Sequence, residues 1–162
     1  MTTRYMYVDL RMARSLGDMR SVLPVARYDW TFNTGGTSAG VPTINPNDPL
    51  MIVVRGHGGA AGTIYGVDAM TWFNANVIQP LRLKYPSLVI LDVIFLVCYA
   101  GVSIQSPNAP ALQVSGNVYG PLKKLVDGGP GDMHVETYGN HFDLKKIFSN
   151  KRYSQLTQYG FV

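Results

Sequence analysis

The chain has a single cysteine, Cys98, and few charged residues, and these two shortages exclude several classes of protein. One cysteine cannot form a disulfide within the chain or a cysteine-rich zinc site. Charged residues make up only 15% of the 162 positions, whereas 46% are hydrophobic. An average domain has about 25% charged residues. The composition is therefore typical of a globular protein that buries a core without covalent cross-links, and not of a disordered chain.

The sequence also lacks concentrated positive charge and a long apolar segment. Its net charge is +4, spread over short pairs such as Lys123 and Lys124, which favours a solvated surface over nucleic-acid binding. The longest apolar run, residues 88–97, contains Asp92 and is about half as long as a membrane span. No charged region followed by an apolar region marks a signal peptide at the N-terminus. We expect a soluble protein, cytoplasmic or exported without a cleaved signal, with no nucleic-acid partner and no membrane span.

Apolar runs of two kinds predict the order of strands and helices. Residues 50–54 (LMIVV) are apolar at every position, which is the pattern of a strand covered on both faces. Elsewhere, alternation predicts strands and three-to-four spacing predicts helices. The strands are expected at 4–10, 25–32, 50–54, 92–97 and 133–138, and the helices at 67–83 and 118–126. This order predicts one α/β domain over residues 1–162, a three-layer sandwich with a mostly parallel central sheet and an unassigned tail from about residue 145.

Two residues with catalytic chemistry follow two of the predicted strands. His57 lies in a glycine-rich turn directly after residues 50–54, and Cys98 follows residues 92–97. Their separation of 41 positions (98 − 57) accommodates one helix crossing between adjacent parallel strands, so both residues should lie at the same sheet edge. An imidazole beside a thiol can take its proton and prepare it for nucleophilic attack. Each residue alone also has a simpler interpretation, as a turn histidine and a packed cysteine.

The segments MIVVRGHGG and IFLVCYAG resemble the caspase–haemoglobinase group of cysteine peptidases (clan CD). This group includes caspases, legumain, gingipain, clostripain, separase and the self-cleaving domains of large bacterial toxins. The resemblance covers about a third of the chain, from Leu50 to Gly101. It implies a caspase-like fold and a cysteine endopeptidase with a protein or peptide substrate and no cofactor. Cys98 would form a thioester, His57 would protonate the leaving amine, and the N–H groups of Gly58 and Cys98 would form the oxyanion hole.

The sequence departs from caspases themselves. Caspases carry Gln-Ala-Cys-x-Gly around the nucleophile. Here Leu96 and Val97 precede Cys98, and glycine follows only at Gly101, so the chain is more similar to the bacterial branches of the group. By analogy, a chain this short suggests a bacterial or phage effector or a toxin component.

Substrate specificity and metal binding have only weak sequence signals. By position, Arg27, Asp29 and Glu136 are candidates for lining the substrate pocket, and they favour opposite substrate charges, so neither charge is chosen. His134 and His141 have nearby carboxylates, but no helical spacing of ligands accompanies them, so no metal site is expected.

Two other functions are compatible with the same residues. A cysteine–histidine pair also serves deamidases, transglutaminases and deubiquitinating enzymes. Alternatively, the chain is a non-catalytic binding module in which Cys98 is merely packed.

Overall fold

Five parallel strands form the central sheet of the molecule, described here from a computed structural model for residues 3–10, 18–129 and 131–162. The strand order is β2-β1-β3-β6-β7, and every neighbouring pair is parallel. The prediction of an α/β fold with a mostly parallel central sheet is therefore confirmed. The strands are β1 (Arg4–Leu10), β2 (Tyr28–Phe32), β3 (Leu50–Gly56), β6 (Ile90–Val97) and β7 (Val118–Tyr119).

The central strand β3 is buried along its whole length because both faces of the sheet are covered. Ile52 and Val54 face a core on one side of the sheet. Met51 and Val53 face a second core on the other side. Alternation along the strand thus divides one apolar run between two cores.

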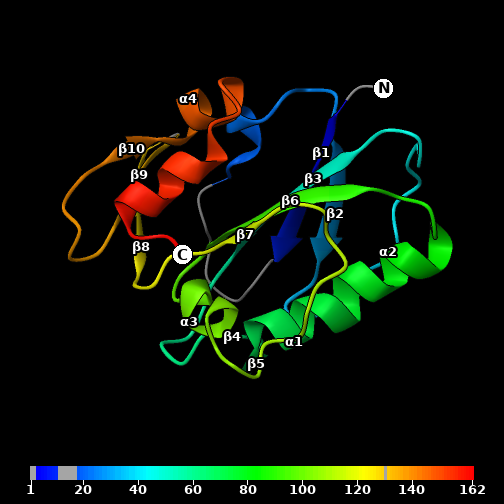
Figure 1. Cartoon of the computed structure of the whole chain (residues 1–162), viewed down its shortest axis with the longest axis horizontal. Helices are drawn as coiled ribbons and strands as arrows, with labels where there is room; N and C mark the ends of the chain where they lie inside the picture. The colour runs from blue at the N-terminus through cyan, green and yellow to red at the C-terminus, as the bar shows by residue number, and fades with distance from the viewer. Residues whose placement is uncertain (1–2, 11–17, 130) are drawn as a thin grey trace.

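A helical segment covers the first face of the sheet and connects β3 to β6 (Figure 1). It consists of α1 (Ala69–Phe73), a π-helical turn (Asn74–Ile78) and α2 (Gln79–Lys84). The side chain of Asp68 caps its start by accepting a hydrogen bond of 3.0 Å from the Thr71 N–H. The π turn ends at Ile78, two residues before Pro80, which has no N–H for the regular helical ladder. The helix expected at 67–83 is therefore present, except that its first two residues form β5 (Val67–Asp68), which pairs with β4 (Thr63–Ile64).

The other face of the sheet is covered by the C-terminal third of the chain (Figure 1). A small antiparallel sheet has the order β10-β9-β8. The strands of this sheet are β8 (Leu125–Gly129), β9 (Asp132–Val135) and β10 (Phe142–Asp143). The helices in this layer are α4 (Leu144–Ser149) and two 3-10 helices, Arg20–Val22 and Tyr153–Tyr159. The tail from residue 145 is thus folded into this layer.

The predicted helix over residues 118–126 is wrong. Val118–Tyr119 form the edge strand β7, and β8 begins at Leu125. Gly120 and Pro121 interrupt the segment, and both are poor residues for a helix interior. The main chain of this segment instead makes hydrogen bonds with distant parts of the chain. The Gly101 N–H, for example, donates to the Pro121 carbonyl at 2.9 Å.

Three further details differ from the sequence-based expectations. The strand expected at 25–32 begins only at Tyr28. The strand expected at 133–138 is β9, which ends at Val135 before Thr137 adopts a left-handed conformation with φ of 73°. A short helix, α3 (Ala100–Ile104), was not expected and begins two residues after Cys98.

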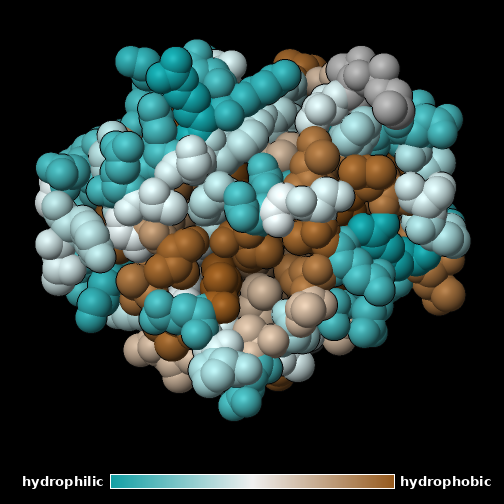
Figure 2. All heavy atoms as spheres, viewed as in Figure 1, coloured by the Kyte–Doolittle hydropathy of each residue, from teal (hydrophilic) through white to brown (hydrophobic). Residues whose placement is uncertain are grey.

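The surface is mixed, as the low share of charged residues predicts. Figure 2 shows apolar atoms across the middle of one face, around β6 and β7, with hydrophilic residues around them. Within the described ranges, no helix is long and apolar enough to cross a membrane.

Tyr7 makes the stability of this fold sensitive to alkaline pH. Burial raises the pKa of Tyr7 to about 12, from an ordinary value of 10, so folding favours the neutral phenol. The stabilisation is complete below pH 10 and is lost as the pH rises through 12. We expect the unfolding free energy of the wild type to fall, between pH 8 and pH 11, by roughly 1 kcal/mol more than that of Tyr7→Phe in urea denaturation. Equal falls in the two proteins would contradict this role of Tyr7.

Candidate active site

His57 and Cys98 directly follow two neighbouring strands, as the sequence predicts. The register of β3 and β6 pairs Arg55 with Leu96 and Gly56 with Val97. His57 and Cys98 are the next residues after this last aligned pair, so both lie at the carboxyl edge of the sheet. Both residues are half-buried, so both combine contact with the core and access to solvent.

The main chains of Gly58 and Cys98 are in close contact. A Cβ atom at position 58 would lie 2.0 Å from the Cys98 carbonyl oxygen and 2.8 Å from Cγ1 of Val97. Only glycine fits at this position, because no side-chain atom can approach a main-chain oxygen so closely. The glycines around His57 therefore allow its turn to lie against the cysteine.

A sharp turn follows Cys98 and presents it at the sheet edge. Tyr99 has a left-handed conformation, with φ of 63° and ψ of 8°, which is uncommon for a residue other than glycine. The Tyr99 N–H donates to the Lys123 carbonyl at 3.0 Å, and α3 begins at the next residue. Such local strain is found where a fold holds a functional side chain in position.

The sulfur of Cys98 contacts the main chain of Leu125, the first residue of β8. The Leu125 N–H donates to Sγ at 3.2 Å, and the thiol lies 3.7 Å from the Leu125 carbonyl oxygen. The thiol thus both accepts from and donates to the main chain of Leu125, and these two contacts fix the position of the sulfur. Sequence reasoning missed Leu125, since a main-chain N–H leaves no signature in the residue type.

Two of the three candidate pocket residues are not brought to the cysteine. Arg27 and Asp29 form an ion pair of 3.0 Å. They belong to the β2 edge of the sheet, and strands β1 and β3 separate β2 from β6. In the register of the sheet, Asp29 is aligned with Tyr7 of β1, and Tyr7 is aligned with Val53 of β3. Asp29 is therefore level with a position three residues before Gly56, away from the edge that carries Cys98.

Glu136 is brought into the neighbourhood of Cys98. Its N–H donates to the Lys124 carbonyl at 2.8 Å, and Lys124 precedes the residue that contacts the sulfur. The Glu136 side chain is exposed. Among the three candidates, Glu136 directly follows β9 of the small sheet that contains Leu125, the residue in contact with the sulfur.

The other two histidines form a separate pair on β9 and the loop before β10. Their ring centroids are 4.3 Å apart, and Nδ1 of His141 lies 3.0 Å from Oδ1 of Asp132. Nδ1 of His134 is buried and has no hydrogen-bond partner. Across the described part of the chain, no three His, Cys, Asp or Glu residues are grouped so as to hold a metal ion.

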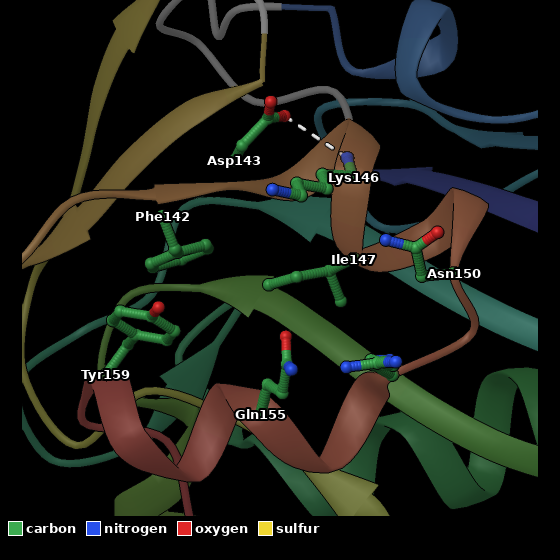
Figure 3. Close-up of a pocket in the computed structure, with 8 residues that line it drawn as sticks. Phe142, Asp143, Lys146, Ile147, Asn150, Gln155 and Tyr159 are labelled. Carbon is green, nitrogen blue, oxygen red and sulfur yellow. Dashed lines mark hydrogen bonds between the residues drawn. The ribbon is translucent and has the colours of Figure 1, made fainter.

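A pocket of about 240 Å³ opens in the outer layer, between α4 and the last 3-10 helix (Figure 3). Lys146 of α4, Asn150 directly after α4 and Gln155 opposite them line it, and Phe142 and Tyr159 lie at one end. The pocket is distinct from the pair at the sheet edge, because neither His57 nor Cys98 is among its lining residues.

Comparison with known proteins gave no match: no family model, no curated protein and no solved structure is similar to this chain. The interpretation of the site therefore depends on its own geometry and chemistry.

Proposed function

We propose that the protein is a thiol hydrolase, most specifically a caspase-like cysteine endopeptidase, in which His57 and Cys98 form the catalytic pair. The observation that carries the proposal is the register of β3 and β6, whose last aligned pair, Gly56 and Val97, directly precedes these two residues at the carboxyl edge of a parallel sheet. The main-chain contact between Gly58 and Cys98 adds independent support for their proximity.

The reaction would proceed through a thioester. The thiol proton of Cys98 passes to His57, and the thiolate attacks the carbonyl carbon of the substrate. As the C–N bond breaks, the proton passes from His57 to the leaving amine. Water then hydrolyses the thioester, which releases the acid and restores the thiol.

Main-chain donors would stabilise the charge that develops on the substrate oxygen. The N–H groups of Gly58 and Cys98 are the candidates, and their main chains are already in contact. Preorganised donors of this kind contribute about 10²–10³ in rate when they point at the oxyanion. The Leu125 N–H would hold the sulfur in position before the attack.

Peptide cleavage by the wild type and by Cys98→Ala is the decisive comparison. We expect the wild type to cut members of a broad peptide library at neutral pH and Cys98→Ala to leave them intact, as read by mass spectrometry. Equal products from both proteins would contradict the enzymatic proposal. A mass gain of about one dalton at Gln or Asn, without cleavage, would replace the peptidase with a deamidase that uses the same thiol.

Thiol alkylation separates a catalytic cysteine from a packed one. Because the chain has one cysteine, uptake of iodoacetamide measures Cys98 alone. We expect His57→Ala to slow alkylation of the folded protein at pH 7, whereas the exposed His141, replaced in the same way, serves as a matched control with no effect. A thiol that does not react in the folded wild type would favour the non-catalytic binding module.

A further inference from the structure

The side chain of Arg55 is buried although it carries a full charge. It is 5% exposed and lies on β3 between Val54 and Gly56. A buried guanidinium is costly unless its charge is paired and its N–H groups are hydrogen-bonded. The contacts of Arg55 must therefore offset the cost of burying its charge.

The guanidinium of Arg55 connects three strands. One terminal nitrogen donates to the Leu96 carbonyl of β6 at 3.4 Å, and the other lies 3.5 Å from Oδ2 of Asp127 on β8. The second carboxylate oxygen of Asp127 accepts from the Gly129 N–H at 3.0 Å, which fixes the orientation of the carboxylate. Arg55 thus links the small antiparallel sheet to the central sheet.

All three linked positions are two residues away from the candidate site. Arg55 precedes His57 by two and Leu96 precedes Cys98 by two, while Asp127 follows Leu125 by two. Residues two apart in a strand share a face and are separated by about 6–7 Å. The pair of Arg55 and Asp127 therefore lies two residues along the strands from the level of the thiol, on the side of the sheet that β8 covers.

Leu125 is held between two anchors. On one side, the Lys123 carbonyl accepts the Tyr99 N–H at 3.0 Å, and on the other side Asp127 pairs with Arg55. The Leu125 N–H is directed at the sulfur between these anchors. Pairing with β9 holds β8 within the small sheet, so loss of Asp127 removes a contact that joins β8 to the central sheet beside Cys98.

We propose that Arg55 is a positioning residue for the nucleophile, acting through Asp127 to hold β8 so that the Leu125 N–H donates to Sγ of Cys98. This inference rests on the proposed function in taking Cys98 as the reactive thiol. The Leu125 N–H orients the sulfur, so a correctly held β8 keeps the nucleophile in the position from which it attacks.

Charged and titratable residues lie in every segment packed near Cys98. They are His57 after β3, Lys123 and Lys124 before β8, Glu136 after β9, the pair of Arg55 and Asp127, and Asp9, which is aligned with Arg55 on β1. A test must separate the N–H donor from these charges. Asp127→Asn removes one negative charge, which by Coulomb's law alone favours the thiolate, whereas release of β8 disfavours it. The two causes predict opposite shifts.

The test is the rate of iodoacetamide alkylation of Cys98 between pH 5 and pH 10 in the whole chain. For Asp127→Asn we expect the profile to move to higher pH and the rate at pH 7 to fall roughly three- to tenfold, as for the loss of one hydrogen bond. Arg55→Lys keeps the charge but not the two-pronged contact, so it is expected to move the profile in the same direction. Asp29→Asn, which breaks an ion pair at the far edge of the sheet, is the matched control with an unchanged profile.

An unchanged profile, or a move to lower pH, in folded Asp127→Asn would overturn the inference. The substituted side chain is a quarter exposed in the wild type and keeps an oxygen for the Gly129 N–H, so this variant is expected to fold. The alkylation profile does not depend on peptide cleavage. Failure of the wild type to cut peptides would therefore remove the proposed function, whereas an unshifted profile in a protein that still cuts peptides would remove only the role of Arg55.

Discussion

Gly58→Ala is expected to destabilise the protein by about 3 kcal/mol, at the upper end of the range for overpacking. The added methyl group would lie 2.0 Å from the Cys98 carbonyl oxygen and 2.8 Å from Val97. Both contacts involve the end of a buried strand, so neither neighbour can move without disturbing the central sheet. Urea denaturation at pH 7 measures the change as a lower midpoint with little change in slope.

The same substitution should also impair the candidate site in the molecules that remain folded. The turn that carries His57 would have to move away from Cys98 to make room, so thiol alkylation at pH 7 should slow. Gly35→Ala is the matched control, because its methyl group would meet only Oδ1 of Asn33, at 3.3 Å, and we expect a change within about 0.5 kcal/mol. Wild-type stability in Gly58→Ala would contradict the contact between the two turns, and with it the register from which the site is inferred.

The central strands could be predicted because burial determines their residues. The run from Leu50 to Val54 has no polar position, as expected for a strand with a core on each face, and the strand is indeed buried throughout. A helix-length segment between this run and the next then restricts the connection to a parallel crossover. For the same reason, the sequence predicts that His57 and Cys98 follow neighbouring parallel strands, as they do.

The layer that covers Cys98 could not be predicted in the same way. Residues 118–126 have apolar positions compatible with a helix, yet the main chain there pairs with α3 and with the C-terminus, where Val162 donates to the Gly120 carbonyl at 2.9 Å. These partners are distant in the sequence, so the helix and strand propensities of neighbouring residues do not predict them. The tail was unassigned for the same reason, because α4 is stabilised by packing on the core of the outer layer.

The candidate site was accordingly predictable only in part. The side chains of His57 and Cys98 are visible in the sequence, whereas the donor from Leu125 is a main-chain group. Arg55 did leave a signal, since a charged residue at the end of an apolar run must find a partner when it is buried. Its partner Asp127 lies 72 positions away, beyond any local pattern.

Phe95→Ala is expected to have the largest effect on stability, about 3–5 kcal/mol, since it removes a large side chain from the centre of a core. Phe95 lies on β6, is completely buried, and packs edge to face against Phe73 of α1 with 4.9 Å between ring centroids. This contact fixes the crossover that brings β3 and β6 together. Thermal unfolding followed by circular dichroism should show a melting temperature lower by well over 10 °C.

The control for Phe95→Ala is Leu83→Ala, on the helix of the same layer. Leu83 is 86% exposed, so its truncation should change the unfolding free energy by less than about 0.5 kcal/mol. Similar effects of the two substitutions would contradict the burial pattern of the sheet. Because Phe95 faces the helical layer and the sulfur of Cys98 contacts β8 on the opposite face, folded Phe95→Ala should keep the wild-type pH profile of alkylation. The same measurements thus separate residues that hold the sheet together from residues that position the thiol.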